Sequence, residues 1–126
     1  MKMSISYSDA EVILKAYYEK VFEGATIDFK MESYKKKTWY EDNSYYLTKW
    51  KGKLIVNRTI KGLNSDKAVA FEKECSGEDL KTALIDALSE TFVSESLAVS
   101  AVFLCEDSIH LFLDKSEVKK LVLNRE

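Results

Sequence analysis

Hydrophobic positions change their spacing along the chain, and the first segment has the spacing of a helix. From residue 10 to 21 an apolar side chain recurs every three to four positions, which places the set on one helical face. The set is Ala10, Ile13, Leu14, Tyr17 and Val21. Ser8 and Glu11 form a capping-box pattern ahead of it, and Gly24 follows it as a helix stop. We therefore predict a helix from about 9 to 22.

From residue 25 the spacing falls to two, which is typical of strands. Ile27, Phe29 and Met31 alternate with charged residues, as in a strand with one buried face. Further strands are predicted near 36–41, 45–50, 54–61 and 67–74. Gly, Asn, Asp and Ser supply turns between them at 42–44, 51–52 and 62–66. Because consecutive short strands pair mainly with their neighbours, this segment predicts an antiparallel meander of four to five strands.

The helical spacing returns after Ser76, which is a good helix cap with Glu78 and Asp79 in the first turn. Its apolar stripe is Leu80, Ala83, Leu84, Ala87, Leu88 and Phe92, and we expect the helix to end between 90 and 94. Apolar residues at 97–104, a turn at 106–108 and a strand at 109–113 predict a hairpin. The segment 116–123 fits a short helix or an edge strand.

The expected fold class is therefore α+β in a single domain, 1–126. It comprises an N-terminal helix, an antiparallel meander of four to five strands, a second helix and a C-terminal hairpin with a short terminal element. The chain has 126 residues, 46% of them hydrophobic, which is enough for a core without a metal or disulfide. The longest uncharged run in the apolar C-terminal part, 96–105, is ten residues, and a membrane span needs about 20. With no signal-like N-terminus, we expect a soluble, cytoplasmic protein with no membrane contact.

Catalytic and metal-binding patterns are weak. Cys75, Cys105 and the single histidine, His110, lack the short paired spacing of metal ligands, so we expect no metal and no cofactor. Cys105 and His110 flank one predicted turn and could form a nucleophilic pair, although a buried thiol and an ordinary imidazole are the more usual interpretation. The four glycines are too dispersed for a phosphate loop. We therefore do not expect an enzyme.

Charge and aromatic residues are unevenly distributed. The net charge of −2 divides into −1 over 1–27, +5 over 28–67 and −6 over 68–126. Seven of the fifteen aromatics lie in the basic stretch: Phe29, Tyr34, Trp39, Tyr40, Tyr45, Tyr46 and Trp50. Neighbouring strand residues point to opposite faces, so the doublets 39–40 and 45–46 each place one ring away from a one-sided core. Aromatic strand residues with solvent-facing lysines are also ordinary in a sheet, so a purely structural interpretation stays open.

The first helix carries a second candidate surface. Glu11, Lys15, Tyr18 and Phe22 form a row outside its main apolar stripe. Such a helix either contributes to an interface or lies between the sheet and the C-terminal segment.

These features favour a small non-catalytic protein-binding module. We interpret it as an inhibitor of a partner protein, of the general type of immunity proteins, antitoxins and phage-encoded anti-defence proteins, with charge steering the encounter and rings supplying affinity. The alternative is a nucleic-acid- or small-ligand-binding domain that uses the basic aromatic segment 28–67. The candidate contact residues are Tyr34, Trp39, Tyr40, Tyr46, Trp50, Lys35, Lys36, Lys37, Lys51, Arg58, Tyr18 and Phe22.

Overall fold

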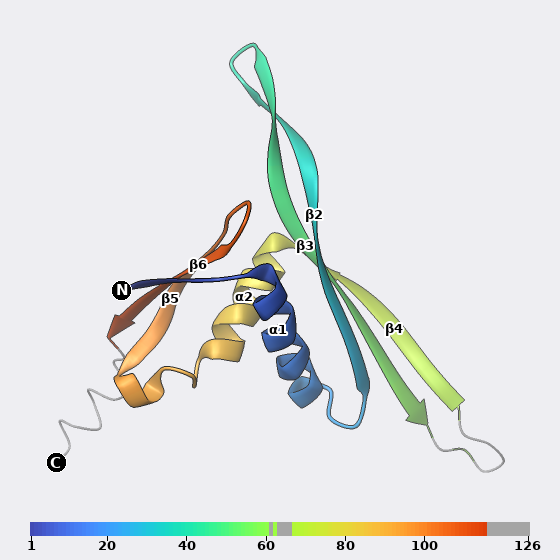
Figure 1. Cartoon of the computed structure of the whole chain (residues 1–126). Helices are drawn as coiled ribbons and strands as arrows, with labels where there is room; N and C mark the ends of the chain where they lie inside the picture. Colours follow the sequence, from blue (N-terminus) through green and yellow to red (C-terminus); the bar gives the residue numbers. More distant parts are fainter. Residues whose placement is uncertain (61, 63–66, 116–126) are drawn as a thin grey trace.

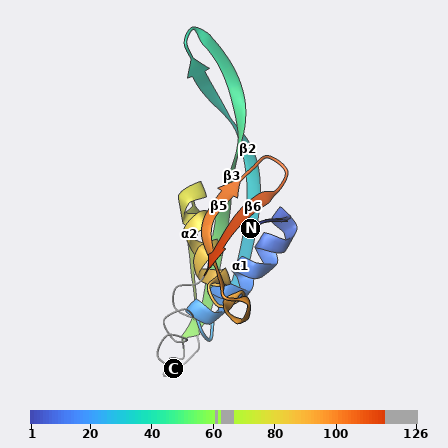
Figure 2. The same cartoon turned by 90° about the vertical axis from the view of Figure 1, so that its left-hand side faces the viewer.

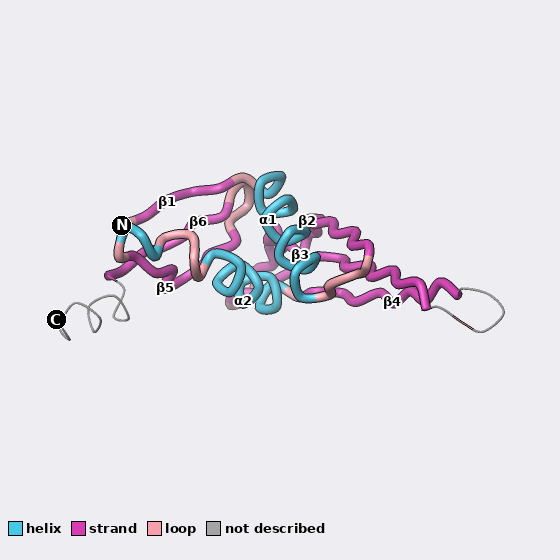
Figure 3. Tube along the Cα trace, turned by 90° about the horizontal axis from the view of Figure 1, so that it is seen from below, coloured by secondary structure: helices cyan, strands magenta, loops and turns pink. Residues whose placement is uncertain are grey.

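Two helices lie between two antiparallel sheets of three strands each (Figures 1 and 3). The computed structural model describes residues 1–60, 62 and 67–115. One sheet has the order β1-β6-β5 and the other the order β2-β3-β4. The elements in chain order are β1 (Lys2–Ile5), α1 (Tyr7–Val21), β2 (Thr26–Tyr40), β3 (Asn43–Ile60), β4 (Lys67–Cys75), α2 (Gly77–Leu88), a 3-10 turn (Val93–Glu95), β5 (Leu97–Leu104) and β6 (Ile109–Lys115). The α+β class is confirmed.

Both predicted helices are present, with shifted ends. α1 begins at Tyr7 because Ser6, and not Ser8, is the N-cap: its Oγ accepts the Asp9 N–H at 3.1 Å. Ser76 caps α2 as predicted, and its Oγ and the Asp79 carboxylate complete a capping box. These hydrogen bonds lower the pKa of Asp79. α2 ends at Leu88, before the predicted 90–94.

The meander has three strands, so the prediction of four to five was wrong. β2 runs unbroken through the interval between the strands expected near 27–31 and 36–41, and β3 joins those expected at 45–50 and 54–61. Gly52, expected in a turn, is a strand residue that pairs with Met31. The position requires a glycine because a side chain there would meet the ring of Phe29 and a methyl group of Leu80. The reversal occurs at Glu41 and Asp42, and Tyr40 pairs with Asn43.

The second sheet contains the predicted C-terminal hairpin and one strand that the sequence did not reveal. β5 and β6 pair across the turn after Cys105, as expected. β1 adds to the free edge of β6, with Met3 opposite Leu111. Only four residues form β1, too few for a clear alternation. The expected terminal element at 116–123 lies outside the described residues.

The core fills the space between the sheets and the helices. Its most completely buried large side chains are Leu14, Leu54, Leu80, Leu84, Ile109 and Leu111. They come from both helices and both sheets, so burial of these side chains joins the layers into one unit. Across 1–60, 62 and 67–115, neither helix has the length and apolar character to span a membrane.

Candidate functional site: the projecting ribbon

The far half of the β2–β3 hairpin extends beyond the rest of the molecule (Figures 1 and 2). β4 pairs with β3 only between Gly52 and Ile60, so the two strands continue alone beyond that point. We define this part, residues 32–51, as the ribbon. None of its side chains is buried. A two-stranded hairpin gains little stability by itself in water, so the ribbon depends on what holds its base.

Both faces of the ribbon carry aromatic rings. The register places Tyr34 opposite Lys49 and Thr38 opposite Tyr45 on one face, together with Lys36, Tyr40 and Leu47. The other face carries Trp39, Tyr46 and Trp50 with Lys35 and Lys37. Trp39 is 63% exposed, Tyr40 67% and Tyr46 65%. The rings of both doublets are therefore exposed on opposite sides, as the one-sided-core argument predicts.

Lysines lie over two of these rings. Lys37 Nζ is 4.8 Å from the centre of the Trp39 ring, and Lys51 Nζ is 5.5 Å from that of Tyr34. Each such contact at an exposed site contributes about 0.5–1 kcal/mol. The ribbon has five lysines against Glu32, Glu41 and Asp42, a net charge of +2. Its surface therefore combines exposed aromatic area with a modest positive charge, except at the acidic tip.

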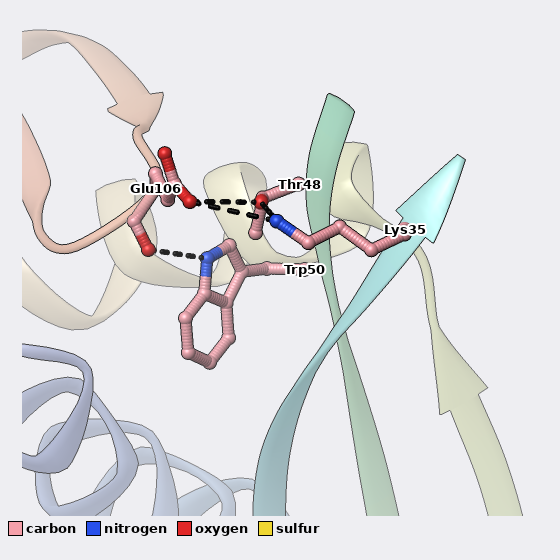
Figure 4. Close-up of polar contacts among 4 residues, drawn as sticks. All are labelled: Lys35, Thr48, Trp50 and Glu106. Carbon is pink, nitrogen blue, oxygen red and sulfur yellow. Dashed lines mark hydrogen bonds and ion pairs between the residues drawn. The ribbon is translucent and has the colours of Figure 1, made fainter. Parts of the chain in front are cut away.

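The base of the ribbon is fixed to the β5–β6 turn (Figure 4). Trp50 stacks on Tyr7 with 3.5 Å between ring centres, and its Nε1–H donates to the Glu106 carbonyl at 3.2 Å. The Glu106 carboxylate accepts a hydrogen bond from Thr48 Oγ1 at 3.2 Å and lies 3.5 Å from Lys35 Nζ. Trp50 and Lys35 thus serve to orient the ribbon, and the rings nearer the tip stay exposed.

Three candidate residues lie outside the ribbon. Tyr18 and Phe22 are half-buried between α1 and the β2-β3-β4 sheet, with ring centres 5.5 Å from Phe29 and 5.6 Å from Phe71, respectively. Arg58 Nη2 donates to the Glu23 carbonyl at 3.3 Å, beside Phe22 and Phe71. The face of α1 that carries Tyr18 and Phe22 is therefore covered by β2 and β4, which is the packing alternative to a free helical surface.

The charge difference along the sequence is partly neutralised in space. Lys53 pairs with Glu72 at 3.6 Å and Lys51 with Glu74 at 3.9 Å, across the β3–β4 ladder. The Lys35–Glu106 pair likewise joins the basic stretch to the acidic one. Within the described residues, these three ion pairs bring parts of the basic stretch and the acidic stretch together.

The two cysteines and His110 are the residues considered for metal and nucleophilic chemistry. Within residues 1–60, 62 and 67–115, no three His, Cys, Asp or Glu side chains are grouped to hold a metal. Cys75 is buried and free, 4.0 Å from the Tyr18 hydroxyl, and burial raises the pKa of its thiol. His110 pairs with Phe103 in the β5–β6 ladder, and Cys105 is also a free thiol.

Sequence reasoning missed Tyr7 and Glu106, which orient the ribbon. They lie 43 and 56 positions from Trp50, and no local pattern links them. The molecule is thus an α+β protein with one projecting aromatic ribbon as its most exposed feature. Comparison of the chain with protein-family models, with curated proteins and with solved structures found no match in any of the three.

Proposed function

We propose that this protein is a non-catalytic binding module that holds a partner protein through the ribbon and thereby inhibits it. The exposed rings of Trp39, Tyr40 and Tyr46 near the end of the ribbon are the observation that carries this proposal. Tyr and Trp are the residue types that most often dominate the affinity of protein interfaces. Here they lie on the projecting ribbon, so a cleft in a partner protein could contact them on both faces of the ribbon.

The anchored base supports the same function. A surface that is already oriented before binding loses less conformational freedom when the partner arrives. The contacts of Trp50 with Tyr7 and with the Glu106 carbonyl restrict the ribbon in this way. An inhibitor of the immunity-protein, antitoxin or anti-defence type needs only such a pre-oriented surface that occupies the active region of its target.

The test uses the tagged full chain as bait in extract of the cells that make it. We expect one stoichiometric protein partner and loss of that partner's activity on binding. Trp39→Ala and Tyr46→Ala should each weaken the purified complex by about 2 kcal/mol or more, roughly 30-fold in Kd. Phe103→Ala is the matched control, because Phe103 is also an exposed ring, on β5 away from the ribbon. Equal affinity of all three variants would contradict the proposal.

A nucleic-acid-binding ribbon is the second candidate. A two-stranded ribbon fits the major groove of B-DNA, and Lys35, Lys36, Lys37 and Lys49 could meet phosphates. The acidic tip, Glu41 and Asp42, opposes such entry and favours the protein partner. Titration of labelled DNA and RNA oligonucleotides separates the two: nucleic-acid binding would fall steeply with salt and with Lys36→Ala. A flat titration at low salt removes this candidate.

A further inference from the structure

The backbone edge of the ribbon differs between its two strands. On β2, the Met31 N–H points away from β3 and donates to Glu11 Oε1 at 2.8 Å. α1 therefore covers the β2 edge at the base, and the run of Lys35, Lys36 and Lys37 lies further along the same strand. Lysines on an edge strand disfavour the addition of another strand.

Between residues 43 and 48, the edge of β3 has neither the cover by a helix nor the lysines that protect the edge of β2. This segment contains no charged residue and no Pro. β4 stops opposite Gly52, so no third strand of the described chain pairs with β3 beyond that residue. Native proteins seldom leave such an edge open.

The register identifies the residues whose backbone groups face outward. In an antiparallel pair of strands, two directly opposite residues either exchange backbone hydrogen bonds with each other or both direct their N–H and C=O groups away from the partner strand. Met31 points away, so its partner Gly52 does too, and the alternation continues without a register shift along the ribbon. The N–H and C=O groups of Ser44, Tyr46 and Thr48 are therefore those presented at the open edge.

The charges at the two ends of this segment are complementary to each other. Glu41 and Asp42 precede it at the tip, and Lys49 follows it at the other end. All three are exposed, and the structure gives none of them an ion pair within the described residues. An antiparallel copy of the same segment would place the acidic tip of one chain beside Lys49 of the other, at both ends.

We propose that two copies of this chain pair through their β3 edges, antiparallel and centred on Tyr45, to form a continuous four-stranded sheet. Ser44 of each copy then exchanges backbone hydrogen bonds with Tyr46 of the other, and Glu41 lies opposite Lys49. Such a two-fold contact is self-complementary, as closed dimers require. It uses the edge and leaves both faces of each ribbon to the partner of the proposed function, so either proposal can fail alone.

Sedimentation equilibrium of the full chain over a wide concentration range tests this pairing. We expect the mass to rise reversibly from 14.5 kDa towards twice that value. Glu41→Lys and Lys49→Glu should each raise the dimer dissociation constant at least about tenfold through like-charge contacts. An equimolar mixture of the two variants should associate again, because both end contacts of the mixed dimer then join a lysine to a glutamate. Lys36→Glu, the same charge change on β2, is the control and should leave the wild-type value unchanged.

A second pair of variants tests the edge itself. Ser44→Pro removes an outward N–H without breaking a β2–β3 hydrogen bond, and Ser44→Ala keeps that N–H. We expect Ser44→Pro to abolish the dimer and Ser44→Ala to retain it, with unchanged circular dichroism in both. A monomer at every concentration overturns the proposal, as does a dimer that is indifferent to Ser44→Pro and to both charge reversals. Recovery of association only with an acidic peptide would assign the edge to another partner and would also overturn it.

Discussion

The two halves of the β2–β3 hairpin share one unbroken register and have opposite environments. In the near half, alternate residues point towards the helices, and Ile27, Phe29 and Leu54 are at most 3% exposed. In the ribbon the register continues unbroken, yet both faces meet solvent. The difference in environment arises near Gly52, where the cover by β4 and the helices ends.

The near half of the hairpin contributes mainly to stability, and the ribbon is the half that is exposed for recognition. Apolar side chains of the near half contribute to folding because they leave water. The rings of Trp39, Tyr40 and Tyr46 remain exposed to water in the monomer, so they contribute little to folding and are available for a partner. Substitutions in the two halves should therefore affect different measurements.

The largest expected difference is between two leucines of the same strand. Leu54→Ala should lower the free energy of unfolding by about 2–5 kcal/mol, because Leu54 is 1% exposed and its removal leaves a cavity. Leu47→Ala is the matched change in the ribbon, where Leu47 is 37% exposed, and should cost less than about 1 kcal/mol. Urea unfolding followed by circular dichroism measures both. Equal losses would mean that the ribbon is packed in solution.

The junction between the halves is the next point to test. A Cβ on Gly52 would lie 2.8 Å from Phe29 Cζ and 2.9 Å from Leu80 Cδ2, so Gly52→Ala should cost about 1–3 kcal/mol through overpacking. Gly77→Ala is the control, since its nearest neighbour would be 3.7 Å away. Cys75 lies opposite Gly52 and reports on the same site. Because burial raises its thiol pKa, its alkylation should be slow in the wild type and faster in Gly52→Ala.

If Gly52→Ala is as stable as the wild type and Cys75 is no more reactive, the junction has room that the structure does not show. The β2–β3 strands would then tolerate a side chain at this position, and the close approach of Phe29 and Leu80 would not explain the glycine.

Local pattern predicted the elements whose signals lie within a few residues. Ser76 with Asp79, and the alternation of Ile27, Phe29 and Met31, gave α2 and the start of β2. The local pattern gave the wrong prediction at Gly52. The sequence alone does not distinguish a glycine in a turn between two strands from a glycine within one strand. The difference depends on the packing of Phe29 and Leu80 against this position. The sequence did not predict β1 for a related reason: β1 pairs with β6, which lies more than a hundred residues away in the chain.

The sequence predicted which residue types form the candidate site, but not where in the fold they lie. The aromatic and lysine content of 28–67, and the doublets Trp39–Tyr40 and Tyr45–Tyr46, indicated an exposed surface. Nothing local showed that β4 would stop at Gly52 and leave those rings without cover. The opposite roles of Trp39 and Trp50, one exposed and one stacked on Tyr7, likewise depend on a distant residue.

The smallest expected effect concerns how firmly the ribbon is held to the near half. Glu106→Ala removes the carboxylate that contacts Lys35 and Thr48, and keeps the carbonyl that binds Trp50. Since these groups are exposed, the free energy of unfolding should change by no more than about 1 kcal/mol. Local opening of the ribbon should increase, and amide exchange at Leu47 and Lys49 should become up to about 5-fold faster. Ile55, in the near half of β3, should keep its wild-type rate.

Asp107→Ala is the matched control for this measurement, because Asp107 lies in the same turn and has no ion pair or side-chain hydrogen bond among the residues that the structure describes. If Glu106→Ala and Asp107→Ala give the same exchange rates, the stacking of Trp50 on Tyr7 holds the ribbon alone. Trp50→Leu then becomes the decisive variant, because it removes both the stack and the Nε1–H donor. Faster amide exchange confined to the ribbon in Trp50→Leu would show that this one side chain holds the ribbon to the rest of the molecule. The two halves of the hairpin would then open independently.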